Sequence, residues 1–407
     1  MTLQPVSMSK KNILILTNTF PRWKNDATPP FIYQLEKRLA HKFNIIILVP
    51  HYFGSKKYEI IDGMEVFRFT YFWPKRLQKL CYDGGILSNL RKHKTLIIQI
   101  PFLFLAQFFS IRKIIRRKKI NFIHAHWLIP QGLVAAIISL LYRVPYIITI
   151  HGGEVFALKS NFINIFLKIA LRHGSICTAN SEATKKEVIS KTNLFIPVEI
   201  IPMGIDTNLF TYKCRNGEHN LRKRYEVEGP LLLFIGRLIK EKGLCYLINS
   251  MTDIVNNFPS TKLLIIGEGG LKNDMINLTD RLNLLNNIFF LGGIANDKLP
   301  EFYGAADIFI GPSLSEGEGI TFIEAMLCGC PVIGSRVGGI KETITHMETG
   351  LLVEPSNSDQ IARAVIDLLE NNKLRKKLSV NGRRKAIEKF SWDNISNRFQ
   401  SLYLKMN

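Results

Sequence analysis

The sequence predicts an α/β protein built from two doubly wound domains. The chain has 407 residues, which is more than a single hydrophobic core usually serves. Short aliphatic runs alternate with helical patterns along its length, as expected of parallel strands connected by helices. A turn-rich segment, 201–210, separates two series of such units and is suited to a hinge. We therefore expect the same architecture to occur twice.

In the first series, continuous apolar runs bounded by turn residues indicate strands buried on both faces. The segment between the first two runs places Phe31, Leu35 and Leu39 on one helical face. Strands are predicted within 11–18, 43–50, 121–127, 146–153 and 175–181, and a helix within 31–41.

The second series begins after Pro202 and repeats the pattern. Strands are predicted within 229–237, 262–269, 287–293, 306–313 and 330–335. A final helix is expected to begin at Trp392, with Ile395, Phe399, Leu402 and Leu404 available for burial. These limits predict one domain at 1–205, a second at 206–390, and a C-terminal helix at 391–407.

Two apolar segments raise the question of membrane insertion. Leu96 to Ile111 contains Pro101 and is shorter than the roughly 20 residues that a spanning helix needs. The segment 133–150 is divided by Arg143 and Pro145 into a helix and a strand. Neither segment is predicted to cross a membrane.

The cysteines and the N-terminus bear on the compartment. Six cysteines are scattered without Cys-x-x-Cys pairs, and no His, Cys and Asp cluster shows metal-ligand spacing. This argues against zinc and against a disulfide framework, so we expect no metal and no cofactor. The apolar run Ile13 to Leu16 is too short for the core of a signal peptide. A cytoplasmic location is expected.

The formal charge of +21 lies almost entirely in the first half of the chain, where residues 1–205 carry 29 Lys and Arg against 10 Asp and Glu. Basic residues cluster within 75–79, 91–94 and 112–119. Such a field favours anionic lipid headgroups, phosphorylated acceptors or nucleic acid. A solvated surface is the alternative.

The strongest local signal for a binding site is the string SEGEGITFIEAM. Glu316 and Glu324 flank Gly317 and Gly319, in a turn that leads from a strand into a helix expected to begin at about Ile320. Amide N–H groups at such a helix start bind anions or hydroxyl groups. The Glu324 carboxylate is suited to accept two hydrogen bonds from a ribose. A capped helix with two surface glutamates is the alternative.

A basic pair follows the first strand of the second series. Arg237 comes directly after Gly236, at the carboxyl end where ligands bind in open α/β sheets, and Lys242 precedes Gly243. A guanidinium fork and a mobile ammonium together suit a diphosphate. The pair belongs to neither a Walker loop nor a Gly-x-Gly-x-x-Gly motif, and a solvated pair is the alternative.

His151 ends a predicted buried strand and is followed by two glycines, which let a ligand approach the backbone closely. A structural role for this histidine is the alternative.

Taken in chain order, these motifs resemble family 4 of the retaining GT-B glycosyltransferases, the surface-polysaccharide type of the group 1 enzymes. The resemblance covers nearly the whole chain and implies two Rossmann-like domains that face each other across a cleft. It also implies an acceptor-binding first domain, a nucleotide-sugar-binding second domain, and a C-terminal helix that crosses back to the first. The motifs are FPRWKND (20–26), IHAHW (123–127), HGGE (151–154), PMGID (202–206), GRLIKEKG (236–243), IGEG (266–269) and the Glu-x₇-Glu string.

The resemblance assigns roles to individual residues. It implies that Arg237 and Lys242 hold the donor diphosphate and stabilise the leaving group. Glu324 is then the ribose ligand, Glu316 lies near the donor sugar, and His151 lies beside the reacting sugar. Its catalytic residues are His151, Glu316, Arg237 and Lys242, and its further donor-binding residues are Gly236, Ile294, Gly317, Gly319 and Ile320.

The implied reaction is metal-independent sugar transfer, with retention, to a lipid-linked or polysaccharide acceptor in cell-envelope glycan biosynthesis, such as that of lipopolysaccharide or exopolysaccharide. A UDP-sugar is the expected donor and a GDP-sugar the alternative. The basic first domain is expected to rest peripherally on the anionic inner face of the cytoplasmic membrane. A nucleotide-sugar epimerase or another non-transferase of the same fold remains an alternative. So does a nucleic-acid-binding protein, although the sequence lacks an RNP, KH or helix-turn-helix signature.

The chain departs from the family pattern at three places. Pro29 and Pro30 stand in the loop 25–31, where relatives carry glycine, and proline cannot donate a backbone hydrogen bond. Glu154 replaces the commoner Asp, and Glu318 a common Phe. These changes bear on the acceptor and the sugar more than on the reaction class.

Overall fold

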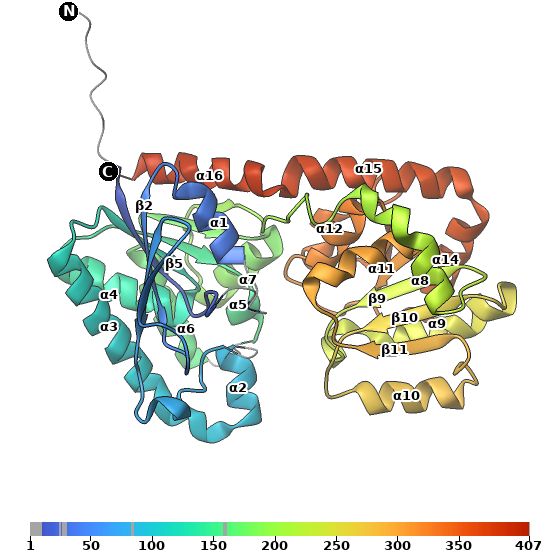
Figure 1. Ribbon diagram of the computed structural model, residues 1–407, viewed down its shortest axis with the longest axis horizontal. Helices are drawn as coiled ribbons and strands as arrows, with labels where there is room; N and C mark the ends of the chain where they lie inside the picture. The colour runs from blue at the N-terminus through green and yellow to red at the C-terminus, as the bar shows by residue number, and fades with distance from the viewer. Residues whose placement is uncertain (1–9, 24–25, 27–30, 83–84, 158–160, 407) are drawn as a thin grey trace, which may run out of the picture. The chain divides into compact units, whose positions relative to one another are not determined.

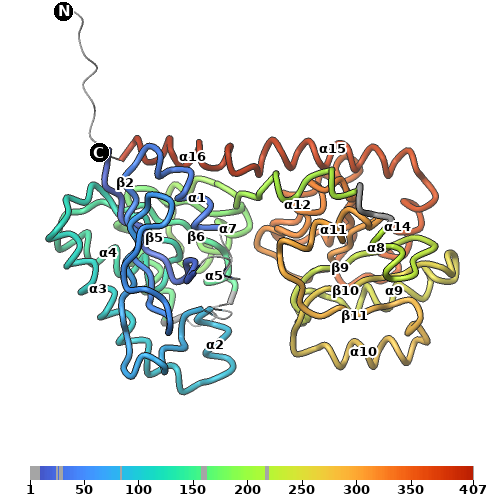
Figure 2. Tube along the Cα trace, in the orientation of Figure 1, coloured from blue at the N-terminus to red at the C-terminus, as the bar shows by residue number. Residues whose placement is uncertain are grey.

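The structure, a computed structural model, describes residues 10–23, 26, 31–82, 85–157 and 161–406. It divides into two compact units, which Figures 1 and 2 trace from blue to red. Unit 1 consists of residues 1–180, 184–201 and 395–407, and unit 2 of residues 181–183 and 202–394. The end of the chain therefore belongs to the first unit. The loop 25–31, with Pro29 and Pro30, lies largely outside the described residues.

Unit 1 contains an eight-stranded sheet in which neighbouring strands are parallel, except that β3 and β4 pair antiparallel. The strand order is β3-β4-β2-β1-β5-β6-β7-β8. The five strands predicted in this half are confirmed. The bounds are β1 Asn12–Leu16, β2 Asn44–Pro50, β3 Tyr58–Ile61, β4 Met64–Phe69, β5 Phe122–His126, β6 Tyr146–Ile150, β7 Ile176–Ala179 and β8 Val198–Ile200.

The helices of unit 1 connect and cover these strands, as a doubly wound sheet requires. The helix predicted within 31–41 is confirmed as α1. The bounds are α1 Phe31–Leu39, α2 Ile86–Lys92, α3 Gln99–Arg117, α4 Leu133–Tyr142, α5 Gly153–Ala157, α6 Asn161–Arg172 and α7 Glu182–Thr192, and α16 Trp392–Lys405 adds its later turns. Ile395, Phe399 and Leu402 of α16 are buried as expected, but Leu404 is exposed, because it lies two residues after Leu402 and so on another face of the helix.

The helix around α3 is longer than the sequence pattern suggested. It begins as a 3₁₀ turn at Lys94 and continues to Arg117, because Ile114 prolongs its buried face beyond the apolar run that ends at Ile111. Within the described residues, Lys94–Arg117 is the one helix long and apolar enough to span a membrane, judged by length and composition alone. Leu103, Gln107 and Ile111 bury one face of it within unit 1, as in a surface helix.

Unit 2 contains six parallel strands in the order β11-β10-β9-β12-β13-β14. Numbered along the chain, this is the 3-2-1-4-5-6 order of a dinucleotide-binding sheet. All five predicted strands of this half are confirmed, and β14 is additional. The bounds are β9 Leu231–Ile235, β10 Lys262–Ile266, β11 Ile288–Gly292, β12 Ile308–Gly311, β13 Val332–Ser335 and β14 Leu351–Val353.

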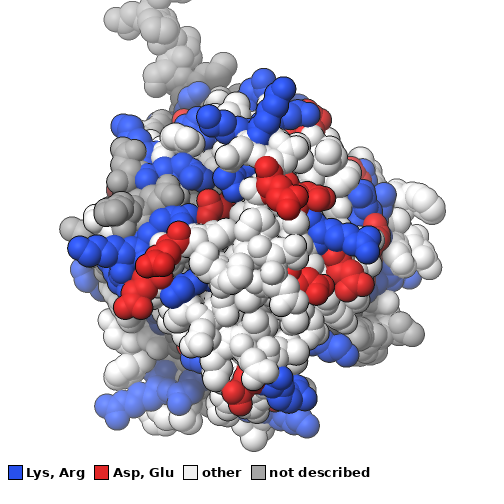
Figure 3. Space-filling view, turned by 90° about the vertical axis from the view of Figure 1, so that its right-hand side faces the viewer, with Lys and Arg blue, Asp and Glu red and all other residues white. Residues whose placement is uncertain are grey.

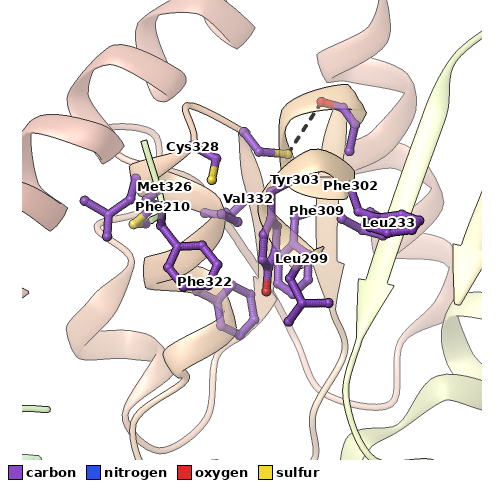
Figure 4. Close-up of a cluster of buried hydrophobic side chains, with 14 of the residues drawn as sticks. Phe210, Leu233, Leu299, Phe302, Tyr303, Phe309, Phe322, Met326, Cys328 and Val332 are labelled. Atoms are coloured by element: carbon purple, nitrogen blue, oxygen red, sulfur yellow. Dashed lines mark hydrogen bonds between the residues drawn. The ribbon is translucent and has the colours of Figure 1, made fainter. Parts of the chain in front are cut away.

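Each face of this sheet has its own hydrophobic core, because successive strand residues point to opposite faces. Leu233 and Phe309 pack with α8, α11, α12 and α15, and Figure 4 shows Phe309 beside Tyr303. Leu232 packs on the other face with α9, α10 and α14. The bounds are α8 Glu218–Arg224, α9 Leu244–Asn257, α10 Lys272–Arg281, α11 Leu299–Ala305, α12 Ile320–Leu327, α13 Ile340–Thr343, α14 Ser358–Glu370 and α15 Asn372–Phe390.

Candidate functional site

The sheet of unit 2 has its topological switch point between β9 and β12. These strands are hydrogen-bonded neighbours, but the chain leaves them in opposite directions across the sheet. Ligands of open α/β sheets bind beyond the carboxyl ends of the strands at this point. The loop 236–243 follows β9 and the loop 312–319 follows β12, so the fold brings together the two strongest sequence motifs.

Backbone and side-chain contacts fasten these two loops to each other. The backbone N–H of Leu314 donates to the carbonyl of Glu241 over 2.8 Å. Lys242 Nζ forms an ion pair with Glu316 Oε2, and Ser313 Oγ lies 3.4 Å from the same oxygen. Both members of the ion pair remain partly exposed, with side-chain accessibilities of 19% and 16%. Lys242 and Glu316, predicted from separate motifs, therefore belong to one site.

Two glycines permit close approach to the 312–319 loop, one from the 236–243 loop and one from the segment that follows β13. Gly243 has φ +63°, and a Cβ there would lie 2.1 Å from the carbonyl oxygen of Pro312. Gly338 has φ +43°, and its Cβ would lie 1.9 Å from the carbonyl oxygen of Glu316. Both positions require glycine, because a side chain would be strained by the backbone angle and would collide with main-chain atoms.

Helix α12 begins at Ile320, as predicted, after Gly319 in the left-handed region. No side chain caps this helix start, so its first amide N–H groups point toward the loop that contains Gly317. Unit 2 thus presents a partial positive charge at the same strand ends as the basic pair.

Glu324 lies on the second turn of α12 and is buried, which rules out the alternative of a surface glutamate at this position. The Tyr303 hydroxyl of α11 donates to Glu324 Oε2 over 2.8 Å. Burial raises the pKa of Glu324 to about 7, against a smaller lowering effect of the Tyr303 hydrogen bond. The carboxyl group is therefore held in a fixed orientation and is easily neutralised.

The remaining predicted residues occupy different places at the strand ends. Arg237 is exposed, and within the described part of the chain its guanidinium has no ion pair or hydrogen bond. Gly236 donates its backbone N–H to the Ile266 carbonyl over 3.0 Å and is fixed by the sheet. Ile294 lies beyond β11, two strands away from β9, and is half-buried against the core.

His151 follows β6 in unit 1 and stands among aromatic rings. Its Nε2 lies 3.0 Å from His126 Nδ1, and the two imidazoles are stacked with an interplanar angle of 24°. The rings of Phe31 and Trp127 have centroids 5.2 and 4.9 Å from that of His151. Glu154 Oε1 accepts from the His151 backbone N–H over 3.1 Å, and burial raises the pKa of Glu154 to about 7.

Behind His151 lies a buried network that the sequence interpretation missed. Tyr403 of α16 donates to Glu36 Oε1 of α1 over 3.1 Å, and its hydroxyl lies 2.6 Å from His124 Nδ1. His124 Nε2 lies 2.7 Å from Thr149 Oγ1. Glu36, His124 and His126 each place a potential metal-ligating atom within 4.8 Å of the others. Both nitrogens of His124 are already engaged, so the arrangement is described better as a hydrogen-bond network than as a metal site.

Burial sets the charge state of this network. It lowers the pKa of His126 to about 3 and the pKa values of His124 and His151 well below their ordinary value. It raises the pKa of Glu36 to about 8. At neutral pH the three imidazoles are therefore uncharged and Glu36 carries a proton.

The sequence did contain a signal for this network. His124 and His126 are two residues apart in a predicted strand, so their side chains share one face of the sheet. The string IHAHW entered the sequence analysis only as a family motif. Glu36 and Tyr403 carried no local signal, because each lies on a helix far from the other in sequence.

Comparison with known proteins identifies the family. A family model described as Glycosyltransferase Family 4 matches residues 30–209, and one described as Glycosyl transferases group 1 matches residues 218–385. An uncharacterized glycosyltransferase of Methanocaldococcus jannaschii is 32% identical over 296 residues, which cover 70% of this chain and 75% of the relative. The chain belongs to glycosyltransferase family 4. The activity class and the predicted family are thereby confirmed.

Two further comparisons extend this assignment. A GDP-mannose-dependent alpha-(1-6)-phosphatidylinositol monomannoside mannosyltransferase of Mycobacterium tuberculosis is 28% identical to this glycosyltransferase over 66% of the chain and 71% of the relative. The solved structure of Anabaena HepE in complex with UDP superposes with a TM-score of 0.73 at 20% identity, over 97% of this chain and 100% of that one. The predicted GT-B fold is confirmed.

Proposed function

We propose that this glycosyltransferase moves a sugar, with retention and without a metal ion, from a nucleotide-sugar to a lipid-linked or polysaccharide acceptor of the cell envelope. The observation that carries the donor assignment is the meeting of the 236–243 and 312–319 loops at the switch point of unit 2. This arrangement offers two cations, a helix start and a buried carboxyl group to one ligand.

The proposed chemistry follows from where charge develops. Breaking the anomeric C–O bond leaves negative charge on the departing diphosphate. Arg237, Lys242 and the start of α12 stabilise that charge by hydrogen bonds and by the helix dipole. Lys242 already pairs with Glu316, so the diphosphate competes with this carboxylate for the ammonium group. Retention is proposed to arise from attack on the same face, with the departing phosphate accepting the proton of the acceptor hydroxyl.

A UDP-sugar is the proposed donor and a GDP-sugar the second candidate. The fold likeness to a protein solved with UDP and the similarity to a GDP-mannose-dependent enzyme support these two nucleotides. Thermal unfolding of the protein with UDP, GDP, ADP and CMP tests the choice. Stabilisation by UDP or GDP above that by the other two is expected, and equal shifts with all four contradict it.

The basic pair is tested by the double variant Arg237→Ala/Lys242→Ala. Loss of two cations at the leaving group is expected to lower turnover of the donor at least 100-fold, because a single electrostatic contact of this kind contributes about 2.7–4 kcal/mol to transition-state stabilisation. Lys240→Ala is the matched control, since Lys240 lies in the same 3₁₀ turn and is exposed. Wild-type turnover in the double variant contradicts the assignment.

The acceptor is proposed to lie on an anionic bilayer that unit 1 contacts. Helix α3 exposes Phe102, Leu105 and Phe109, with accessibilities of 48%, 55% and 56%. Helix α4 packs against α3 and exposes Leu140 and Leu141. A shallow hollow beside these side chains is lined by Phe109, Arg112, Lys113, Arg116 and Arg117.

An apolar stripe bordered by Arg and Lys is the pattern of a helix that lies in the headgroup region of a membrane. Each basic residue near an anionic surface adds about 1 kcal/mol of attraction. The combination of apolar area and positive charge favours anionic lipid over a protein partner. The phosphatidylinositol mannoside acceptor in the name of the mycobacterial relative supports a lipid-borne substrate for this chain as well.

A further inference from the structure

Glu36 Oε2 and His126 Nε2 are among the buried polar atoms of unit 1 that lack a hydrogen-bond partner within the described residues. The Glu36 and His126 side chains are inaccessible to solvent, and His126 Nε2 lies 3.7 Å from Glu36 Oε1. A buried polar atom left without a partner destabilises a fold by about 1–3 kcal/mol. At 3.7 Å the two groups do not form a hydrogen bond, and a rotation of the carboxyl group that brought a protonated Glu36 oxygen to His126 Nε2 would satisfy both with one proton.

The second nitrogen of His126 faces His151. The 3.0 Å between His126 Nδ1 and His151 Nε2 leaves room for one hydrogen, which one ring donates and the other accepts. If His126 Nδ1 carries it, His151 Nε2 is the acceptor. A neutral His151 must then hold its own hydrogen on Nδ1.

Glu36 determines whether the hydrogen between the two rings is on His126 Nδ1 or on His151 Nε2. A protonated carboxyl group donates to His126 Nε2, and the single hydrogen of the neutral His126 ring must then be on Nδ1. The rest of the network is consistent with this state. Since Tyr403 donates to Glu36, its oxygen accepts from His124 Nδ1–H, and His124 Nε2 accepts from Thr149.

We propose that Glu36 and His126 are positioning residues that keep the hydrogen of His151 on Nδ1, so that His151 presents an N–H donor to an oxygen of a bound sugar. That this ligand is a sugar rests on the proposed function, whereas the control of the tautomer rests on the geometry of unit 1 alone. Within the described residues, His151 Nδ1 has no hydrogen-bond partner. It is therefore the nitrogen available to a ligand.

The experiment reads the tautomer directly. Full-length protein labelled with ¹⁵N-histidine gives two-bond ¹H–¹⁵N spectra in which protonated and bare ring nitrogens differ in chemical shift, and His151→Gln assigns the His151 signals. Nδ1–H is expected in the wild type. His126→Phe and Glu36→Leu are expected to move the protonated-nitrogen signal of His151 to Nε2. Glu36→Gln is expected to retain Nδ1–H, because its amide donates to His126 as the protonated acid does.

The control is His93→Gln, which alters an exposed histidine and leaves the His151 signals unchanged. Nε2–H on His151 in the wild type overturns the proposal without any variant. Folded His126→Phe and Glu36→Leu proteins that keep Nδ1–H overturn it as well. No substrate is required, so this result is separate from the nucleotide-induced thermal shift of unit 2. A failed nucleotide shift with the expected tautomer refutes the proposed function alone.

Discussion

At the scale of single residues, this protein keeps three glutamates in surroundings that favour their neutral form. Glu36 and Glu154 lie near His151 in unit 1, and Glu324 lies on α12 in unit 2. Burial raises the pKa of each, to about 8, 7 and 7. Buried carboxyl groups with raised pKa values are frequent at functional sites. Each is also a source of pH-dependent stability.

The change Glu36→Gln tests this dependence. In the unfolded chain Glu36 ionises near pH 4.5, whereas the folded protein retains the proton up to about pH 8. The stability contributed by this group is therefore full below pH 4.5 and is lost as the pH rises through 8. Glutamine does not titrate, so the stability of the variant relative to wild type should increase by more than about 1 kcal/mol between pH 5 and pH 8.

Chemical denaturation at the two pH values measures this difference. Glu370→Gln, an exposed position on α14, is the control and should show no pH-dependent gain. Parallel stability curves for wild type and Glu36→Gln would falsify the prediction.

Gly243 provides a second test at this scale. Alanine there is strained by φ +63° and collides with the Pro312 carbonyl, so the contact between the 236–243 and 312–319 loops must open. We expect Gly243→Ala to lower the free energy of unfolding by about 1–3 kcal/mol and to weaken nucleotide binding at least tenfold. Gly270→Ala, where a Cβ has open space, should leave both unchanged. Isothermal titration with UDP and GDP provides the affinities, and an unaltered affinity in Gly243→Ala contradicts the prediction.

The sequence predicted site residues well where a charged side chain stands in a recognisable local structure. Lys242 and Glu316 each stand in a glycine-containing turn after a buried strand, and the structure joins them. It failed for Tyr403 and Glu36, because a contact across 367 residues leaves no local pattern. The ion pair between Lys242 and Glu316 was also not predicted, because the distance between two loops cannot be obtained from the sequence.

At the scale of elements, the sequence was most informative about the positions of the strands. Apolar runs predicted ten strands correctly, because strands buried on both faces consist mainly of apolar residues, with a few buried polar side chains such as His124 and Thr149. The hairpin of β3 and β4 was missed, although Asp62 and Gly63, both with positive φ, form the dipeptide most typical of tight hairpins. Its strands lie at the sheet edge, where alternating polar residues replace the apolar run.

Helix α3 yields a prediction at this scale. The double variant Leu105→Ser/Phe109→Ser removes two exposed apolar side chains from its outer face without touching the buried one. Binding to anionic vesicles should weaken at least tenfold, because each apolar side chain that enters the headgroup region contributes about 1 kcal/mol or more. Val380→Ser, at an exposed apolar residue of α15, is the control. Vesicle sedimentation at fixed salt measures the effect, and equal binding of wild type and double variant argues against this surface.

At the scale of the whole molecule, the dominant property is the unequal distribution of charge. Residues 206–407 carry nearly balanced charge, and the face in Figure 3 shows Lys and Arg beside Asp and Glu around a broad uncharged area. Almost all of the formal +21 belongs to residues 1–205. The unequal charge of the two halves can be counted from the sequence alone. The exposed apolar stripe on α3 could be identified only from the structure, because the sequence does not show which face of the helix is buried.

Salt should therefore control attachment to membranes. Vesicles that contain phosphatidylglycerol should bind the protein at low ionic strength and release at least nine-tenths of it at about 0.5 M NaCl, where the screening length is only a few ångströms. Neutral phosphatidylcholine vesicles provide the comparison. Sedimentation across a salt series measures both, and attachment that is indifferent to lipid charge and salt rules out an electrostatic contribution.

The membership of residues 395–407 in unit 1 has a consequence for biosynthesis. Tyr403 and Phe399 are buried there, so the first unit still lacks part of its interior when the ribosome has translated all of unit 2. Unit 2 has its complete sequence earlier. The N-terminal half of the polypeptide is thus the last to reach its native state, and a premature stop codon near position 394 damages the part of the protein that was synthesised first.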